Sequence, residues 1–337
     1  MAAPTVALAH APEGAGNATR TIAVAAELRQ RGYDVELAGG GPGTLFAELN
    51  GFDPYEPAGV DFIDQRADSV VRALADTVPR AARRYADFSS WLRVVEPAVL
   101  LADDPFAVAA AERHGVPFVR LDHSTVADFD ALAERVGFTL FNGYSLRRAD
   151  AFCLTTLLPP EQTGRPDLHH VGPVVHVPDP ADPHTPDADP VEPFDVLVVP
   201  GTYSTGFEDL ADDLAADGYD VRLVGGPDWE AVPAMYPVAA AADVVLCTGF
   251  SSIAEATVAG THCVVMPFID CQRGVADRIE AAGVRGVTVA RSLERAGAAV
   301  RDPGPAPVVE SGTGEVADVL EGALGRTAVR EAGAANP

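Results

Sequence analysis

Short apolar runs alternate with amphipathic stretches along the chain, in an order that repeats. An apolar run at 5–11 is followed by a glycine-rich turn at 12–20, a helical pattern at 21–32 and a second apolar run at 33–41. Apolar runs of this length predict strands that are buried on both faces, and the 3.6-residue period between them predicts a helix. The first forty residues therefore predict a β-turn-α-β unit, which builds a parallel sheet.

The same order of elements returns in the second half of the chain. An apolar run at 195–200 precedes a turn at 201–207, a helical pattern at 208–218 and an apolar run at 219–227. The joint GYDVRLVGG in this half also matches GYDVELAGG in the first. We therefore predict a doubly wound parallel sheet in each half. Further strands are expected at 94–104, 115–123, 148–156, 242–249, 262–268 and 286–291.

A segment rich in proline and aspartate separates the two halves. Residues 177–193 show no periodicity and predict an exposed, stiff linker. We expect an N-terminal Rossmann-like domain at 1–176, a second one at 194–325 and a tail at 326–337. Parallel sheets bind ligands at the carboxyl ends of their strands, so the cleft between two facing domains is the predicted site.

The charge of the chain restricts its partners. Its 337 residues include 24 basic side chains, all of them arginine, against 49 acidic ones, which gives a formal net charge of −25. Such a surface repels phosphate backbones, so nucleic acid is excluded as a general partner. A lysine-free acidic surface resembles that of halophilic proteins, and a GC-rich genome is the alternative cause.

Targeting signals and metal-binding patterns are missing from the sequence. The first residues lack the basic and apolar regions of a secretory signal, and no apolar stretch is long enough to span a bilayer. We therefore expect a cytoplasmic protein. The four cysteines lie far apart without CxxC spacing, which indicates buried thiols and no metal site.

Two turns after strands are candidate ligand loops. In the first half, Gly14 and Gly16 let a ligand approach the backbone, and the helix that follows offers unpaired N–H groups. In the second half, Gly201 and Thr202 begin a turn of small residues that could hold a diphosphate. The alternative for both is an ordinary tight turn, capped in the second case by a hydroxyl.

A third candidate turn, at 248–252, comes before a carboxylate. Glu255 is expected in the first turn of the next helix, where it either favours the helix dipole or accepts hydrogen bonds from a ribose. Asp270 and Gln272 follow the next strand and could bind sugar hydroxyls, or form an ordinary polar loop.

Three residues at strand ends are candidate general bases. His10 and His123 each end a predicted strand, and Asp104 ends another beside Asp103. Groups at the same edge of one sheet could face a common cleft and remove a proton there. The alternative is that each is a hydrogen-bonded structural residue. Residues 79–95 carry arginines and aromatics at helical spacing and predict an amphipathic helix with its aromatics inward. The alternative is that these arginines attract a phosphate-bearing or lipid-linked molecule.

Several of these motifs resemble the MurG-like glycosyltransferases of family 28. GAGNATR at 14–20 resembles their GxGHxxR turn, VGPVV at 171–175 resembles the end of their first domain, and residues 242–284 are similar to their donor-binding region. The resemblance implies an α/β protein with the GT-B fold, which has two facing Rossmann-like domains. It also implies a nucleotide-diphosphate sugar as donor substrate, without a cofactor.

The resemblance also implies roles for individual residues. Glu255 would bind the donor ribose, the turn containing Gly249, Ser251 and Ser252 the diphosphate, and Gln272 the sugar. The Gly14–Gly16 loop would bind the acceptor. The resemblance does not identify the acceptor, for which we consider a saccharide or a lipid-linked group met by peripheral membrane contact.

The catalytic part of the resemblance is incomplete. Cys247 occupies the position eight before Glu255, where retaining enzymes often have a second glutamate, and this favours an inverting hexosyl or N-acetylhexosaminyl transfer. Asn17 stands where the family's turn has histidine, and asparagine is no base at neutral pH. The alternatives are a silent nucleotide-sugar-binding or partner protein and a nucleotide-sugar epimerase.

Overall fold

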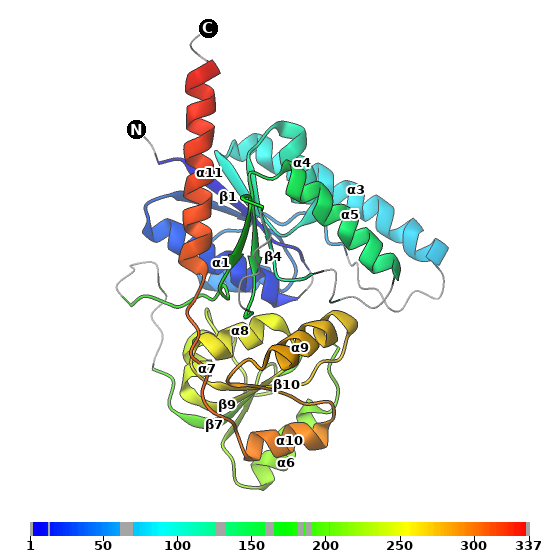
Figure 1. The fold of residues 1–337 in the computed structure, drawn as a ribbon, viewed down its shortest axis with the longest axis vertical. Helices are drawn as coiled ribbons and strands as arrows, with labels where there is room; N and C mark the ends of the chain where they lie inside the picture. Colours follow the sequence, from blue (N-terminus) through cyan, green and yellow to red (C-terminus); the bar gives the residue numbers. More distant parts are fainter. Residues whose placement is uncertain are drawn as a thin grey trace.

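A computed structural model gives the fold of the chain (Figure 1). It describes residues 3–12, 14–60, 70–125, 128, 132–158, 165–180, 185, 190–201 and 203–334. Two parallel sheets stand one above the other, each covered by helices, and this confirms the predicted class of two parallel-sheet α/β domains.

The first sheet has the strand order β2-β1-β3-β4-β5-β6, and every pairing in it is parallel. Strand β1, which lies between β2 and β3, is buried on both faces, with Val6 and Leu8 in one apolar cluster and Ala7 and Ala9 in another. Alternate residues of a strand point to opposite faces, so helices must cover both sides. The strands are β1 (Thr5–Ala9), β2 (Asp34–Ala38), β3 (Val99–Ala102), β4 (Phe118–Asp122), β5 (Ala151–Thr155) and β6 (Leu168–Val171).

The helices of this domain supply apolar side chains to both faces of its sheet. Ile22 and Leu28 of α1 join the cluster on one face, and Phe88 and Trp91 of α3 join the cluster on the other. The burial of these two aromatics confirms the inward-facing helix predicted at 79–95. The helices are α1 (Ala15–Gln30), α2 (Gly43–Leu49), α3 (Val70–Val95), α4 (Pro105–His114) and α5 (Leu132–Arg148).

The second sheet has the strand order β11-β10-β9-β7-β8 and is also parallel. Its central strand is β9, whose Val245 and Val244 lie in clusters on opposite faces. The strands are β7 (Phe194–Val199), β8 (Val221–Leu223), β9 (Ala242–Cys247), β10 (His262–Val265) and β11 (Val287–Val289). The helices are α6 (Phe207–Ala216), α7 (Tyr236–Ala241), α8 (Phe250–Val258), α9 (Asp270–Ala282) and α10 (Leu293–Arg301).

The last helix, α11 (Thr313–Ala334), returns to the first domain (Figure 1). Its residues Val316, Ala317, Leu320 and Ala323 are buried in the same cluster as the α1 side of the first sheet. The expected division into a second domain at 194–325 and a tail at 326–337 is therefore wrong for this helix, which begins at Thr313 and packs on the first domain. Its apolar residues complete a core that begins at the opposite end of the sequence.

Two local elements differ from the sequence expectations. Helix α1 begins at Ala15, so Gly16 and Asn17 lie in its first turn and not in a long glycine-rich loop. Asp270 and Gln272 lie in the first turn of α9, where the Gln272 side chain accepts hydrogen bonds from the backbone N–H groups of Phe268 and Ile269 at 2.9 and 3.3 Å. In both cases residues that the sequence showed as a loop lie in the first turn of a helix.

The strand orders place one loop cluster of each domain opposite the other. In the first sheet the order reverses between β1 and β3, and in the second between β7 and β9. Ligands of open parallel sheets bind at such reversal points, beyond the carboxyl ends of the strands. The topology therefore positions the loops after these four strands to line one shared site.

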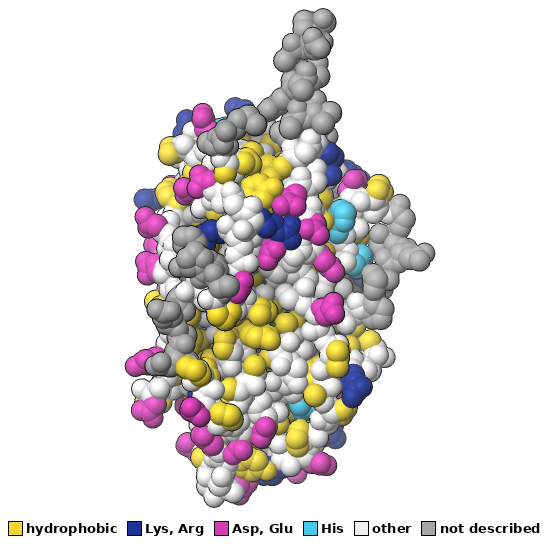
Figure 2. Space-filling view, turned by 90° about the vertical axis from the view of Figure 1, so that its left-hand side faces the viewer, with side chains coloured by type: hydrophobic (Ala, Val, Ile, Leu, Met, Phe, Trp, Pro, Cys, Tyr) yellow, Lys and Arg dark blue, Asp and Glu magenta, His cyan; other side chains and the backbone are white. Residues whose placement is uncertain are grey.

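The acidic character of the sequence is visible on the surface. Figure 2 shows acidic side chains spread over both domains on the face drawn, without a basic patch that dominates it. Within the described residues, no helix is both long and apolar enough to cross a bilayer.

Candidate functional site

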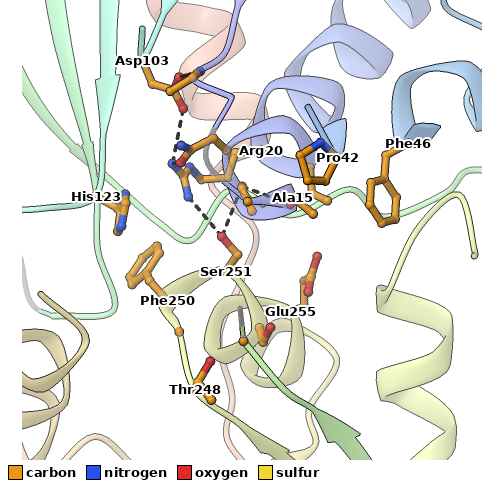
Figure 3. Close-up of a pocket in the computed structure, with 18 of the residues that line it drawn as sticks. Ala15, Arg20, Pro42, Phe46, Asp103, His123, Thr248, Phe250, Ser251 and Glu255 are labelled. Atoms are coloured by element: carbon orange, nitrogen blue, oxygen red, sulfur yellow. Dashed lines mark hydrogen bonds and ion pairs between the residues drawn. The ribbon is translucent and has the colours of Figure 1, made fainter. Parts of the chain in front are cut away.

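A cavity of about 960 Å³ lies between the two domains (Figure 3). The predicted residues that line it come from both domains: Gly14, Gly16, Asn17, His123, Gly201, Gly249, Ser251, Ser252, Glu255 and Gln272. His10, Asp104 and Asp270 are not among the lining residues, and Thr202 lies outside the described residues. The structure therefore brings most of the predicted donor and acceptor loops together and separates them from two candidate bases.

The floor of the cavity on the side of the second domain is the N-terminus of α8. Gly249 is the N-cap residue, and among the described side chains none accepts a hydrogen bond from the first-turn amides as a cap. Backbone N–H groups at such a terminus carry partial positive charge and favour an anion. The β9–α8 turn can thus bind a phosphate group.

Glu255 points into this cavity from α8 (Figure 3). It is the sixth residue of the helix and lies outside the first turn, so the helix-dipole explanation considered for it does not apply. Burial raises the pKa of Glu255 to about 8, an effect that the positive charge of Arg20 opposes. A half-buried carboxyl group that faces a cavity is suited to exchange hydrogen bonds with a ligand.

Gln272 contributes an amide to the same side of the cavity. Its Oε1 accepts the hydrogen bonds that cap α9. Its Nε2 lies beside Gly201 and Gly249, in the loops after β7 and β9, and would be 3.7 Å from a Cβ added to either glycine. The amide N–H groups are thus presented to a ligand. Asp270, in contrast, forms an exposed ion pair with Arg273 outside the cavity.

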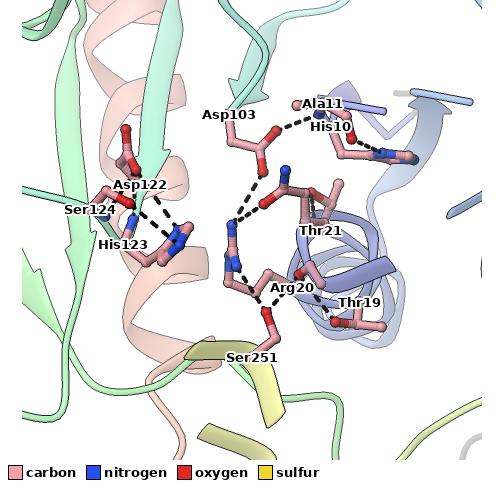
Figure 4. Close-up of polar contacts among 12 residues, drawn as sticks. His10, Ala11, Thr19, Arg20, Thr21, Asp103, Asp122, His123, Ser124 and Ser251 are labelled. Carbon is pink, nitrogen blue, oxygen red and sulfur yellow. Dashed lines mark hydrogen bonds and ion pairs between the residues drawn. The ribbon is translucent and has the colours of Figure 1, made fainter. Parts of the chain in front are cut away.

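Arg20 connects the two domains at the centre of the site (Figure 4). Its Nη1 donates to the Ser251 hydroxyl at 3.1 Å, and its Nη2 donates to Asn17 Oδ1 at 2.6 Å and to Asp103 Oδ2 at 3.4 Å. Burial lowers the pKa of Arg20, and the nearby carboxylate of Asp103 opposes this. Sequence reasoning gave this residue no role, although the GAGNATR turn that was singled out ends on it.

Two of the three candidate bases have structural partners. Asp104 is fully buried, forms an ion pair with Arg84 at 2.8 Å and caps α4 by accepting from Phe106 N and Ala107 N. His10 is 1% exposed and its Nδ1 lies 3.0 Å from the Ala11 carbonyl, and burial lowers its pKa to about 4. Neither side chain is placed to contact a ligand in the cavity.

The cavity instead contains Asp103, the neighbour of Asp104. Its Oδ1 accepts from Ala11 N at 2.6 Å, and burial raises its pKa to about 6 despite the nearby arginines. Adjacent residues at a strand end point in different directions, and the sequence does not show which one faces the site.

His123 is the candidate base that does line the cavity. Its ring stacks on Phe250 of the second domain with centroids 5.1 Å apart, and its Nδ1 lies 3.9 Å from Asp122 Oδ1. Burial lowers the pKa of His123 to about 3, so the imidazole is neutral. Its buried Nδ1 has no hydrogen-bond partner among the described residues.

Comparisons with known proteins show the fold. No protein-family model matches the sequence, and no curated protein matches it by sequence. Three solved structures span nearly the whole chain: SsfS6, a glycosyltransferase of Streptomyces sp. SF2575 (13% identity, TM-score 0.59, 97% of this chain and 96% of that one), the calicheamicin glycosyltransferase CalG4 (18%, 0.59, 97% and 100%) and MurG of Acinetobacter baumannii (14%, 0.55, 94% and 99%). The chain therefore has the fold of these proteins, GT-B.

Proposed function

We propose that the protein is a glycosyltransferase that uses a nucleotide-diphosphate sugar. The observation that carries the proposal is the cavity between the two strand-order reversals, with the α8 N-terminus and the half-buried carboxyl of Glu255 facing into it. The similar structures support it, because SsfS6 and CalG4 are glycosyltransferases and one structure of SsfS6 is a complex with thymidine diphosphate.

The second domain supplies the donor site in this proposal. The N-terminal amides of α8, from Gly249 onward, bind the diphosphate, Glu255 accepts hydrogen bonds from the ribose hydroxyls, and the Gln272 amide contacts the sugar. We propose a hexosyl donor, with N-acetylhexosaminyl as one form.

The proposed reaction is an inverting single displacement. The acceptor oxygen bonds to the anomeric carbon while the bond from that carbon to the diphosphate oxygen breaks, and the electron pair leaves with the diphosphate. The hydroxyl proton passes to a base. We propose His123 for this role, because its ring is neutral and its Nδ1 has no hydrogen-bond partner among the described residues.

For the acceptor we propose the hydroxyl of a saccharide or of a lipid-linked group. Pro42, Phe46 and the neighbouring Ala15 give the first domain's side of the cavity an apolar wall (Figure 3). A lipid-linked acceptor is supported by the exposed residues Leu140 and Tyr144, which lie four positions apart on α5 and offer an apolar contact to a membrane surface.

Calorimetric titration tests the proposal. UDP, TDP and their sugar conjugates are titrated into the protein, and release of nucleoside diphosphate from the bound sugar conjugate is then measured with and without saccharide acceptors. We expect at least one nucleotide to bind, and Glu255→Ala to weaken nucleotide binding about 10-fold or more with the fold intact, since the hydrogen bonds between this side chain and the ribose are lost. Failure of every nucleotide to bind contradicts the proposal.

One observation favours a second function, a silent nucleotide-sugar-binding protein. The Asn17 side chain is not a base. Burial keeps the His123 ring neutral, and the same lowered pKa makes His123 a weak base. Binding without turnover for every acceptor offered would support this alternative over transfer.

A further inference from the structure

A buried arginine of the first domain contacts the anion-binding end of a helix of the second. Arg20 is 2% exposed, and the Ser251 hydroxyl that accepts from it is the second residue of α8. The same hydroxyl donates to the Gly16 carbonyl at 3.2 Å, so the guanidinium lies one hydroxyl away from the first-turn amides (Figure 4). An anion bound by those amides is therefore within reach of Arg20.

The hydrogen bonds of Arg20 leave part of its donor capacity unused. An arginine carries five N–H donors in a fixed fork. Asn17, Asp103 and Ser251 accept from Nη1 and Nη2, while the buried Nε has no partner among the described residues. A buried donor without an acceptor is unfavourable, and a ligand that supplies an acceptor there is favoured.

Arg120, the other described arginine that lines the cavity, also has a buried Nε without a partner among the described residues, but its terminal nitrogens have different partners. Arg120 donates to Asp122 Oδ2 at 3.0 Å and to the Ala102 carbonyl at 3.1 Å, and its guanidinium lies over the Phe141 ring. Both its terminal nitrogens are directed at the first domain's own strands. Arg20 alone of the two reaches toward α8.

We propose that Arg20 binds the diphosphate of the donor from the opposite domain, so that the nucleotide bridges both domains. This assignment rests on the proposed function. As the bond between the anomeric carbon and the diphosphate oxygen breaks, the departing oxygen gains negative charge, and Arg20 stabilises it while remaining protonated. Asn17 and Asp103 hold the guanidinium in this orientation.

The experiment compares ligands with and without phosphates. Affinities for uridine, thymidine, UDP, TDP and inorganic pyrophosphate are measured by calorimetric competition for the parent protein, Arg20→Gln and Arg20→Lys. We expect Arg20→Gln to lose about 10- to 100-fold in affinity for the nucleoside diphosphates, the loss associated with one charged hydrogen bond, and none for the nucleosides. Arg20→Lys keeps a positive charge beside Asp103, so it can be measured even if Arg20→Gln does not fold. Its affinity for the nucleoside diphosphates should fall about 10-fold.

Two controls separate a binding role from a structural one. Arg113→Gln removes one exposed positive charge from α4 and should change no affinity. Glu255→Ala should weaken nucleosides and nucleoside diphosphates alike, because it removes the ribose contact. Equal loss for both ligand classes in the Arg20 variants, or no loss in either, overturns the assignment of Arg20 and leaves the proposed function intact. Failure of the parent protein to bind any nucleotide overturns both.

Discussion

Single residues decide the chemistry of this site through their burial. Glu255 and Asp103 are both carboxyl groups in the cavity, and burial raises the pKa of each, to about 8 and about 6. Arg20 lies between them and limits the effect on both. Burial therefore makes the ionised form unfavourable near neutral pH for Glu255, whereas Asp103 is still ionised there, and hydrogen bonds from a ligand to Glu255 would change this balance.

The raised pKa of Glu255 predicts a pH-dependent stability. A carboxyl whose pKa is higher in the folded chain stabilises the fold fully below its unfolded value near 4.5, and this contribution is lost as the pH rises toward 8. Glu255→Gln should match the parent's Tm at pH 4.5 and exceed it by about 3 °C at pH 8.5, as expected for roughly 1 kcal/mol. Calorimetric melts at the two pH values measure this.

A matched variant makes that measurement specific. Glu48 is exposed on α2, so Glu48→Gln changes the charge of the protein by the same amount without changing the cavity. Its Tm should follow the parent's at both pH values. Equal behaviour of the two variants would show that Glu255 is hydrated in solution.

For single residues, the sequence predicted which positions line the site better than it predicted what each side chain does there. Glu255, Gly249 and Ser251 could be placed at the site because they follow a strand in a parallel sheet. Arg20 could not be placed there, because an arginine in a helical pattern is expected to face solvent. Only the position of the second domain shows that it is buried. Likewise, only the packing of Arg84 shows that Asp104 faces the core and that its neighbour Asp103 faces the cavity.

Among the elements, α1 and α8 are in direct contact across the domain boundary. A Cβ built on Gly16 would lie 2.9 Å from the Ser251 Cβ and would overlap the hydroxyl, so only glycine permits this approach. The sequence identified Gly16 as a residue for close approach to a ligand, and the structure shows close approach to another helix.

The contact predicts the effect of a single methyl group. Gly16→Ala should separate α1 from α8, remove the hydrogen bond between Ser251 and the Gly16 carbonyl, and weaken nucleoside diphosphate binding about 10-fold. Affinity is measured by calorimetry and the helical content by circular dichroism. Gly137→Ala on α5, where a Cβ meets nothing within 4 Å, is the control and should leave affinity unchanged. Equal affinities for Gly16→Ala and the parent would show that the domains are not closed in solution.

On the scale of the whole molecule, the domains are also joined by an ion pair between α9 and a residue of the first domain. Arg278 of α9 donates to both carboxylate oxygens of Asp128, at 2.7 and 2.9 Å, and Asp128 is 1% exposed. The pair links chain segments 150 positions apart, so sequence patterns could not reveal it. Doubly wound sheets were predictable from local periodicity, whereas contacts between domains depend on their mutual orientation.

Breaking this pair should destabilise the whole protein. Arg278→Gln leaves the Asp128 carboxylate buried without its cation, which costs about 3–5 kcal/mol. Urea unfolding measures the loss. The double variant Arg278→Gln with Asp128→Asn removes both charges and should recover much of the stability. If the single variant unfolds at the parent's urea concentration, the pair contributes nothing in solution.

The return of α11 to the first domain has a consequence for how the chain acquires its structure during synthesis. Domains generally form in the order in which they leave the ribosome. Here the core around β1 lacks Val316, Ala317 and Leu320 until the second domain has already been made. The nascent first domain therefore has an open apolar face while the second one emerges, and the last helix closes it.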